Sequence, residues 1–395
     1  MKICFLAPFG IRPKGTVIAR MLPLAAELQA MGHTVTIIAP PYTNPEDSGK
    51  IEKVRGVRLV NVELPSCSKT AGALLIAWRM FLTLRTEQPS LVHLFKPKGY
   101  GGLTAIFILL LKKIGIHLPP LFVDTDDWEG SGGMNDLHSY STAEKRLFAF
   151  QEQWLSKHAN GVTVASLTLE RLTMDMGIPK ERILYLPNCV EAKPPGDKAF
   201  SRTKLGIAAD VPVLLLYTRF FEFTQDRLYL LLAEISRQIP GVKILVAGKG
   251  NNCEEKLLHE AAAEKGFGDA LLMAGWLDPE VISDYFAAAD VAIYPLDNTL
   301  TNRAKCPAKL AELLAAGVPV VADAVGQATE YIKAGNPDLI CRPGDWREMA
   351  ASVVGLLNDN ERRIVLGEAS RIFILEQYSW RKFAILLSKF YSANK

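Results

Sequence analysis

Residues 305–324, KCPAKLAELLAAGVPVVADA, combine a helix signal with a strand signal that follows it at once. Pro307 suits the first turn of a helix, residues 309–316 are good helix formers, and Gly317 suits a left-handed cap. The apolar run 318–322, with a proline near its start, is typical of a strand buried on both faces of a parallel sheet. The stretch therefore predicts half of a β-α-β unit.

The start of this predicted helix is a candidate phosphate site, because unpaired backbone N–H groups and the positive end of the helix dipole lie there. Lys305 and Lys309 would add positive charge, and Glu312, one turn further on, would place a carboxylate beside sugar hydroxyls. An ordinary crossover helix with a weak Lys309–Glu312 ion pair explains the same residues equally well. Both interpretations stay open on this stretch alone.

Length and composition predict an intracellular protein of two domains. The chain has 395 residues, more than one hydrophobic core usually supports, and its net charge of +3 gives no reason to expect nucleic acid as a partner. The N-terminus, MKICFLAPFG, predicts a strand and not a signal peptide. Six cysteines lie scattered without metal-ligand spacing, which favours a reduced, cytoplasmic protein: Cys4, Cys67, Cys189, Cys253, Cys306 and Cys341.

Short apolar runs alternate with helical patterns twice, on either side of a polar segment rich in proline and glycine at residues 191–203. This alternation predicts mostly parallel sheets, with ligands beyond the carboxyl ends of the strands. A helix is expected at 16–31, before Gly32-His33. The strands expected before the linker are 2–8, 34–40, 57–62, 91–95, 121–124, 161–165 and 183–186. Those expected after it are 211–217, 242–247, 270–274, 291–294, 318–322 and 339–341.

The pattern Pro307-x-Lys309-x-x-Glu312-x-x-Ala315-x-Gly317-x-Pro319-Val320-Val321 resembles the donor-site signature of family 4 glycosyltransferases, the glycosyl transferases of group 1. The resemblance implies the α/β GT-B fold, with two Rossmann-like domains of mostly parallel sheets facing across a cleft. It implies domains at 1–190 and 204–376, joined by the linker 191–203, and a closing helix at 377–395 that crosses back to the first domain.

The family implies retaining transfer of a sugar from a UDP- or GDP-sugar to a hydroxyl of a glycan, glycolipid or small molecule, with no metal or other cofactor. An epimerase or hydrolase on the same fold, and a non-catalytic nucleotide-sugar-binding protein, are the alternatives. The apolar and basic segments 71–85 and 103–113 are either core helices or a surface that meets the inner face of the membrane. Neither is long enough without charge to span it.

On the donor side, the resemblance assigns Glu312 to the nucleotide ribose and Arg219 to the diphosphate, with Lys305, Cys306 and Lys309 beside it. Arg219 and Lys305 would stabilise the departing diphosphate, and are therefore predicted to be catalytic. The remaining candidates are Gly15, where the backbone would approach the phosphates, and Lys249, Trp276 and Leu277. Trp276 is either a stacking partner for the base or a core residue.

Two family residues are missing on the donor side. A lysine expected six residues after Arg219 is replaced by Gln225, and Arg227 or Lys305 could supply its charge. The first of the family's paired glutamates is replaced by Ala304, with Asn302, Arg303 and Lys305 nearby.

The acceptor candidates follow two strands of the first half. Lys96 and Lys98 lie in a basic, glycine-rich loop that could bind an anionic group or simply be solvated. Asp126, Asp127 and Trp128 lie in the next loop, where the acids are candidate catalytic groups and the indole could stack on a sugar. Asp126 stands where many family members have a histidine. The Pro187-Asn188-Cys189 loop, which resembles the family's Pro-Asn-Gly, is predicted to be structural.

Overall fold

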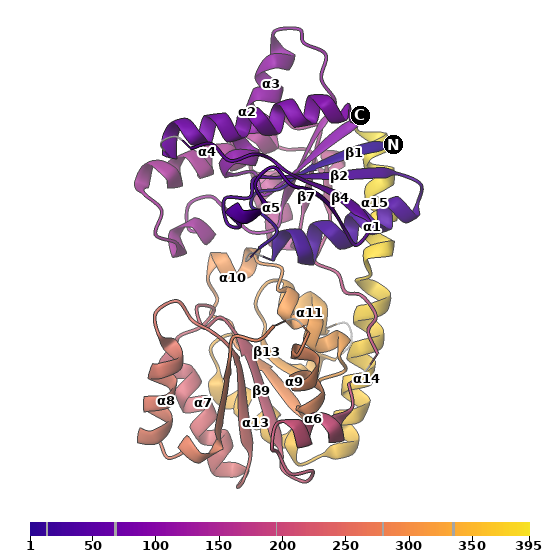
Figure 1. Cartoon of the computed structure of the whole chain (residues 1–395). Coiled ribbons are helices and arrows are strands. Elements are labelled where there is room, and N and C mark those ends of the chain that lie inside the picture. The colour runs from indigo at the N-terminus through magenta and orange to yellow at the C-terminus, as the bar shows by residue number, and fades with distance from the viewer. Residues whose placement is uncertain (13–14, 67–68, 195, 279, 334–335) are drawn as a thin grey trace. The chain divides into compact units, whose positions relative to one another are not determined.

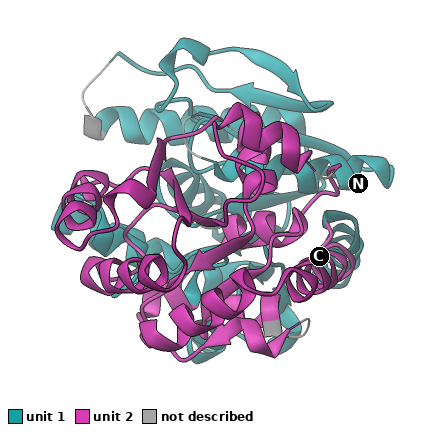
Figure 2. Cartoon of the chain, turned by 90° about the horizontal axis from the view of Figure 1, so that it is seen from below, with its two compact units in different colours: residues 1–189, 304–306, 380–395 teal, residues 190–303, 307–379 magenta. Residues whose placement is uncertain are grey.

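The computed structural model describes residues 1–12, 15–66, 69–194, 196–278, 280–333 and 336–395. The chain forms two compact units (Figure 2). Unit 1 contains residues 1–189, 304–306 and 380–395, and unit 2 contains residues 190–303 and 307–379. Figure 1 labels the elements named below. Cys67 lies outside the described residues, as do positions 13–14 of the loop before Gly15 and position 195 of the predicted linker.

Unit 1 is built on an eight-stranded sheet in the order β3-β4-β2-β1-β5-β6-β7-β8. Its strands are β1 (Lys2–Leu6), β2 (Thr34–Ala39), β3 (Ile51–Val54), β4 (Val57–Asn61), β5 (Leu91–Phe95), β6 (Leu121–Thr125), β7 (Gly161–Val164) and β8 (Ile183–Tyr185). All neighbouring pairs are parallel except β3 with β4. Buried apolar residues fill most of these strands, as strands covered on both faces require.

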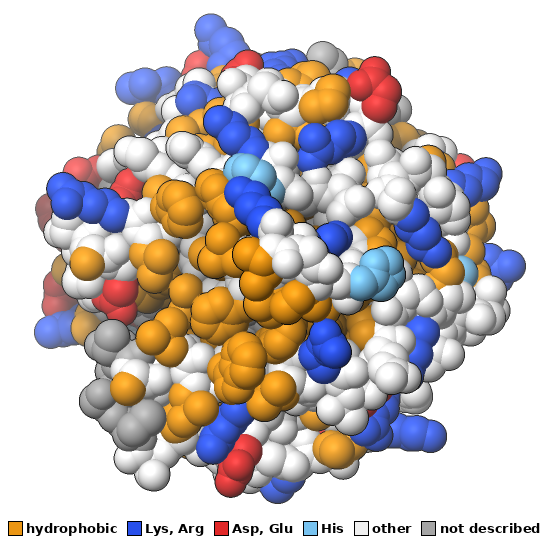
Figure 3. Space-filling view, turned by 90° about the horizontal axis from the view of Figure 1, so that it is seen from above, with side chains coloured by type: hydrophobic (Ala, Val, Ile, Leu, Met, Phe, Trp, Pro, Cys, Tyr) orange, Lys and Arg blue, Asp and Glu red, His pale blue; other side chains and the backbone are white. Residues whose placement is uncertain are grey.

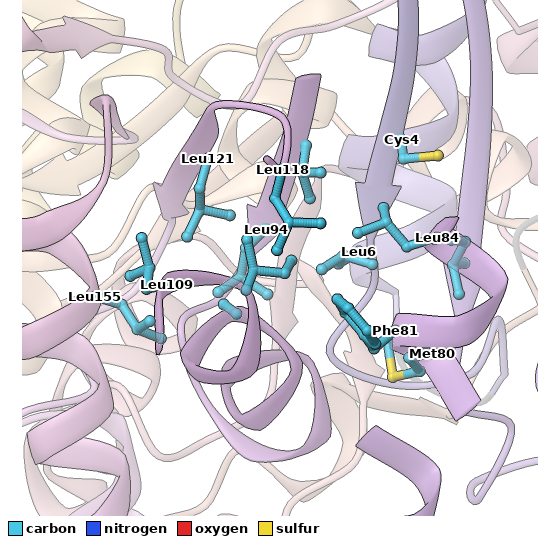
Figure 4. Packing of buried hydrophobic residues seen from close by; sticks show 14 of the residues in the cluster. Cys4, Leu6, Met80, Phe81, Leu84, Leu94, Leu109, Leu118, Leu121 and Leu155 are labelled. Atoms are coloured by element: carbon cyan, nitrogen blue, oxygen red, sulfur yellow. The ribbon is translucent and has the colours of Figure 1, made fainter. Parts of the chain in front are cut away.

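Side chains that alternate along the strands of unit 1 make two apolar layers. Leu6, Leu94 and Leu121 pack with Phe81 of α2 (Lys69–Glu87) and with α3 (Gly99–Lys113), as Figure 4 shows. On the other face, His93 of β5 and Phe122 of β6 contact Tyr391 of α15 (Trp380–Ala393), and Phe5 of β1 packs against His93. The other α-helices of this unit are α1 (Leu22–Ala30), α4 (Thr142–His158) and α5 (Leu167–Asp175).

Unit 2 is built on a six-stranded, all-parallel sheet in the order β11-β10-β9-β12-β13-β14. Its strands are β9 (Val213–Thr218), β10 (Lys243–Gly248), β11 (Leu271–Gly275), β12 (Val291–Tyr294), β13 (Val320–Asp323) and β14 (Ile340–Cys341). Its α-helices are α6 (Lys198–Lys204), α7 (Gln225–Gln238), α8 (Glu254–Glu264), α9 (Ile282–Ala288), α10 (Leu300–Ala304), α11 (Ala308–Ala315), α12 (Gln327–Lys333), α13 (Trp346–Leu357) and α14 (Asn360–Gln377). The last residue of α10 is grouped with unit 1.

The helix and strand expected within residues 305–324 are present as α11 and β13. Pro307 is the N-cap of α11, and Gly317 has φ +78°, the left-handed conformation expected of it. Each strand predicted from an apolar run is also present, within a few residues of its expected ends. The fold class read from the sequence is therefore confirmed.

Three local features differ from the sequence expectations. Strand β3 is a short, largely exposed partner of β4, and the Arg55-Gly56 turn joins them with both residues at positive φ (52° and 81°). The helix expected at 16–31 begins as a π-helix, Val17–Met21, before continuing as α1. Helix α6 occupies the end of the segment predicted to be linker. None of the helices in the described ranges is both long and apolar enough to span a membrane.

Candidate functional site

In each unit the sheet topology marks one place where a ligand is expected. In unit 2 the chain runs from β9 to β10 and β11 on one side, then returns to β12 on the other side of β9. In unit 1 the corresponding reversal lies between β1 and β5. Loops at the carboxyl ends of two strands that diverge in this way leave a crevice, where ligands of doubly wound sheets bind. Arg219 follows β9, and Lys96 follows β5, so both candidate sites lie at these positions.

Arg219 and Lys309 bring two cations to the end of β9. Arg219 is exposed, and the described residues offer it no hydrogen bond or ion pair; its guanidinium lies 5.6 Å from the ring centre of Phe221. Lys309, on the first turn of α11, donates to the Thr218 carbonyl oxygen at 3.0 Å, and its amine lies 3.8 Å from the Tyr217 ring centre. The structure therefore holds the lysine beside the strand end from which Arg219 extends.

Glu312 lies one turn along α11 from Lys309 and is exposed to solvent. Its pKa is nevertheless raised, mainly because surrounding protein displaces part of the water around the carboxyl; Lys193 and Lys309 oppose the shift. The carboxylate is thus accessible to a ligand while lying among protein atoms. Such a carboxylate can accept hydrogen bonds from sugar hydroxyls.

The loops after β10 and β11 complete this edge of the unit 2 sheet. Gly248 has φ +138°, and a Cβ there would lie 1.8 Å from the Thr218 carbonyl oxygen, so only glycine lets β10 end this close to β9. Lys249, the next residue, is exposed. Trp276, after β11, is 65% exposed, which excludes the alternative that it is a core residue, while Leu277 is half-buried.

Gln225, which stands in place of the family lysine, stabilises the loop after β9. The side-chain nitrogen of Gln225 donates to the carbonyl oxygens of Phe220 (2.7 Å) and Phe223 (3.2 Å). Arg227, one of the two residues expected to supply the missing charge, donates to the buried carboxylate of Asp323 at 2.8 Å. Arg227 is thus paired with Asp323, at the end of β13, and its contribution of charge to the diphosphate stays a prediction.

Three candidates on the donor side stay predictions. Lys305 is buried, with 6% of its surface exposed. Cys306 is also buried; its sulfur accepts from the Asn188 backbone N–H at 3.1 Å, and its carbonyl oxygen accepts from the Asn188 side chain at 2.7 Å. A Cβ at Gly15 would meet nothing within 4 Å, so the described chain does not itself require glycine there.

The acceptor candidates of unit 1 form one buried network of charges. Lys96 Nζ lies 2.9 Å from Asp126, 2.5 Å from Asp127 and 3.7 Å from Glu129, and Lys98 Nζ lies 2.7 Å from Glu129. These carboxylates neutralise both lysines, and the network carries more acids than bases. Both lysines are buried, which excludes the alternative of a solvated loop, while their part in binding an acceptor stays a prediction.

Two acids of this network hold protons more tightly than usual. Burial raises the pKa of Asp126 to about 6, with Asp127 adding to the shift and Lys96 opposing it. Burial and the charge of Glu129 raise the pKa of Glu152, on α4, to about 8. Neither carboxyl oxygen of Glu152 accepts a well-formed hydrogen bond from the described residues. The Thr125 hydroxyl lies close enough to oppose the rise in the Glu152 pKa. That hydroxyl donates its hydrogen bond to the Asp127 carbonyl oxygen.

Trp128 is largely buried within its own loop. Its indole N–H donates to the Ser131 carbonyl oxygen at 3.0 Å. A Cβ at Gly130 or Gly133 would lie 2.3 Å or 2.1 Å from Trp128 atoms, because the loop folds tightly over the ring. The indole supports this loop in the structure, and its stacking on an acceptor sugar stays a prediction.

Sequence reasoning missed a second buried network, centred on Arg20 and Asp124. The Arg20 guanidinium donates to both Asp124 oxygens (2.8 and 2.6 Å), to the Asn188 side chain (3.0 Å) and to the Leu186 carbonyl oxygen (2.8 Å). Asp124 also accepts from Thr163 at 2.5 Å. This network fixes the helix after β1, the end of β6 and the 186–188 loop together. An acid at the end of a strand otherwise made of apolar residues was the only signal for it.

Comparisons with known proteins agree with this geometry. A sequence model described as a glycosyl transferase 4-like domain matches residues 15–189, and one described as glycosyl transferases group 1 matches residues 211–359. Together these matches cover most of the chain. Fold and site define a glycosyltransferase scaffold of the GT-B class. The chain belongs to glycosyltransferase family 4, the group 1 glycosyl transferases.

Three similar proteins show the range of the likeness. A GDP-mannose-dependent alpha-(1-6)-phosphatidylinositol monomannoside mannosyltransferase of Mycobacterium tuberculosis is 27% identical over 236 residues, which are 58% of this chain and 60% of the relative. The match thus spans about three fifths of that relative's length. Sucrose-phosphate synthase from Thermosynechococcus elongatus superposes with a TM-score of 0.75 at 18% identity, covering 99% of this chain and 98% of the other. Anabaena HepE, solved with UDP and glucose, gives 0.74 at 19% identity, with both chains fully covered.

Proposed function

We propose that the protein is a retaining glycosyltransferase that moves a sugar from a nucleoside-diphosphate sugar to a hydroxyl group of its acceptor. The observation that carries the proposal is the exposed Arg219, which the described residues leave without an ion pair, beside Lys309 at the point where the unit 2 sheet reverses its strand order. A planar guanidinium next to an amine suits a diphosphate, which offers several charged oxygens.

In the proposed reaction the protein stabilises the charge of the leaving group. As the bond to the anomeric carbon breaks, negative charge grows on the departing diphosphate. This charge would be stabilised by Arg219, Lys305, Lys309 and the first N–H groups of α11. The same diphosphate can take the proton of the attacking hydroxyl on the same face of the sugar, which would retain the anomeric configuration. Glu312 would bind the ribose, and Trp276 with Leu277 would meet the base.

The acceptor side of the proposal rests on the charge network in unit 1. Because Lys96 and Lys98 are already paired with carboxylates, this network suits neutral hydroxyls better than an anionic group. Asp126 and Asp127 would accept hydrogen bonds from those hydroxyls. The mycobacterial relative is named for action on a phosphatidylinositol monomannoside, which supports a glycan or a glycolipid as acceptor.

The proposal includes a cytoplasmic place of action and no need for a metal. Four described cysteines are free thiols, which fits a reducing compartment: Cys4, Cys189, Cys253 and Cys341. Charge stabilisation by arginine, lysine and a helix N-terminus can replace a divalent cation on the diphosphate. UDP and GDP remain the candidate nucleotides, since HepE was solved with UDP and the mycobacterial relative is named for GDP-mannose.

A panel of UDP-, GDP- and ADP-sugars tests the reaction class. Nucleotide release that depends on an added acceptor supports transfer. An altered sugar without acceptor would indicate an epimerase, acceptor-independent release a hydrolase, and saturable binding without turnover a binding protein. The anomeric configuration of the first product, measured by NMR, decides whether transfer is retaining.

Variants locate the donor site. We expect Arg219→Ala and Glu312→Ala each to weaken nucleotide-sugar binding, by about tenfold to a hundredfold for the arginine, if it makes charged hydrogen bonds to phosphate. Arg347→Ala is the matched control, because Arg347 is also exposed and lies over an aromatic ring, Trp346, on α13. Affinity equal to that of the wild type in both test variants would show that the donor binds elsewhere.

A further inference from the structure

Helix α2 carries a second stripe of apolar residues beside the one that it buries. Met80, Phe81 and Leu84 face inward, in the core cluster against the unit 1 sheet. Leu74, Trp78 and Leu82, spaced four residues apart and therefore on one face, are exposed. A helix of a single folded domain normally has one apolar stripe, so the second stripe needs another explanation.

The neighbouring helices repeat this arrangement. On α3, Ile108 and Leu109 belong to the core cluster, whereas Leu110 is exposed, and Ile114, just after the helix, is 74% exposed. On α4, Leu155 is buried in the same cluster, and Phe150 and Leu147 are exposed. All three helices thus present large apolar side chains on the side away from the core.

These exposed residues belong to one surface, which we call the outer apolar face: Leu74, Leu75, Trp78, Leu82, Leu110, Ile114, Leu147 and Phe150. Contacts between the helices connect it. Trp78 of α2 lies 6.3 Å from Phe107 of α3, between ring centres, and Lys113 of α3 lies over the ring of Trp154 of α4. Phe150 stacks on Trp154. Figure 3 shows side chains of this kind gathered in the middle of the view, with lysine and arginine around them.

Acidic residues are nearly absent from this part of the chain. Between residues 64 and 123 the only acid is Glu87, which lies 3.3 Å from Arg58. The same segment carries Arg79, Arg85, Lys112 and Lys113 on α2 and α3. On α4, the residues from 145 to 158 include one acid, the buried Glu152, and the bases Lys145, Arg146 and Lys157. Arg79 pairs with Glu63 (3.6 Å) and Lys145 with Asp136 (3.7 Å). The other bases have no acidic partner among the described residues, so the surroundings of the outer apolar face carry a net positive charge: Arg85, Lys112, Lys113, Arg146 and Lys157.

We propose that the outer apolar face docks on a bilayer that contains anionic lipids. Apolar side chains would enter the boundary between head groups and acyl chains, and the basic residues around them would meet lipid phosphates. Lys112 and Lys113 have aliphatic stems that can lie along the apolar surface while their amines reach the head groups. A water-soluble partner protein would be expected to meet such a face with acids, and a second copy of this chain would bring more positive charge to it. The charge pattern thus favours a lipid surface.

This inference does not depend on the donor chemistry. Unit 1 contains α2, α3 and α4, whereas Arg219 and Glu312 belong to unit 2. Docking could therefore be present even if the proposed transfer reaction is wrong, and transfer could proceed without docking. If both hold, the bilayer would present a glycolipid acceptor to the enzyme.

Co-sedimentation with vesicles tests the proposal. We expect the purified chain to bind vesicles of phosphatidylcholine with phosphatidylglycerol, and to bind pure phosphatidylcholine vesicles at least several-fold less. Binding should weaken as salt is raised, since screening reduces the electrostatic part. The double variant Leu110→Asp and Ile114→Asp should lower the partition coefficient by about tenfold or more, because charge replaces buried apolar surface.

The matched control is the double variant Ile364→Asp and Val365→Asp on α14, whose residues are 64% and 65% exposed and belong to unit 2. It should bind vesicles like the wild type. Because Leu110 and Ile114 are exposed, their replacement should leave the unfolding temperature and nucleotide binding unchanged, so lost docking is separable from lost folding. Replacing Arg85 and Lys113 by glutamine should lower binding to anionic vesicles and leave the weak binding to neutral vesicles unchanged.

Two results would overturn the proposal. One is vesicle binding that is absent in the wild type or equal in the wild type and the Leu110→Asp, Ile114→Asp variant. The other is a wild-type dimer, seen by analytical ultracentrifugation, that this variant converts to a monomer without any effect of vesicles, since the face would then be a protein interface.

Discussion

Glu152 gives the sharpest test of the charge network in unit 1. Its carboxyl group is buried, and its pKa is raised from an ordinary value of 4.5 to about 8, first by burial and then by Glu129. Between these two pKa values the folded protein keeps the proton, whereas the unfolded chain has lost it. Stability therefore falls as pH rises through this window. One pKa unit corresponds to about 1.4 kcal/mol, so Glu152 alone should cost about 3 kcal/mol between pH 5 and pH 8.

Glu152→Gln keeps the shape of the side chain and removes its titration. We expect the variant to be nearly as stable as the wild type at pH 5, and more stable at pH 8 by about 3 kcal/mol, or roughly 6–12 °C in Tm. The free energy of unfolding is measured in urea, and Tm on heating, at several pH values for the wild type and the variant. Subtracting one pH profile from the other removes the contributions of the other titrating groups, which are the same in both proteins. Glu376→Gln, on an exposed part of α14, is the control and should keep the wild-type profile. Parallel profiles for Glu152→Gln and the wild type would refute the raised pKa.

Three further substitutions test separate parts of the structure. Trp276→Ala should weaken nucleotide-sugar binding by about 1–3 kcal/mol if the exposed indole stacks on the base, and unchanged affinity by calorimetry would contradict this. Gly248→Ala should lower the stability of unit 2 by about 2 kcal/mol or more, because the new Cβ would collide with Thr218; an unchanged Tm would count against that close approach. Arg20→Ala should cost about 3–5 kcal/mol by leaving Asp124 buried and unpaired, whereas replacing Arg20 by Met together with Asp124 by Leu should cost much less if the charge is the cause.

The sequence was sufficient to predict most of the fold, because strands buried on both faces are short, uniformly apolar runs that stand out from helical patterns. Strand β3 did not stand out. It is largely exposed, and its turn uses Arg55-Gly56 and not the asparagine or aspartate that usually marks a two-residue hairpin. The sequence therefore predicted the buried strands and did not predict the exposed one.

The candidate site was predictable where its residues lie close together in sequence. Lys309 and Glu312 were identified because a single helix fixes their spacing. Arg20 was missed because its partner, Asp124, is 104 positions away, and no local pattern links them. The packing of Trp128 was not predictable for a related reason: an indole among acids resembles a sugar site, and only the folded loop shows Gly130 and Gly133 against Trp128.

The departures from the family pattern fall on residues that hold the loops of the unit 2 crevice. The Gln225 amide holds the loop after β9, and the Asn302 amide donates to the carbonyl oxygens of Glu222 (2.6 Å) and Asp297 (2.8 Å). These loops follow β9 and β12, the two strands between which the chain reverses direction. A lysine at 225 whose amine reached out to the diphosphate could not at the same time donate to the Phe220 and Phe223 carbonyl oxygens, as the Gln225 amide does. In the proposed reaction, charge toward the diphosphate is therefore expected from Arg219 and Lys309, and sugar selectivity from residues other than Ala304.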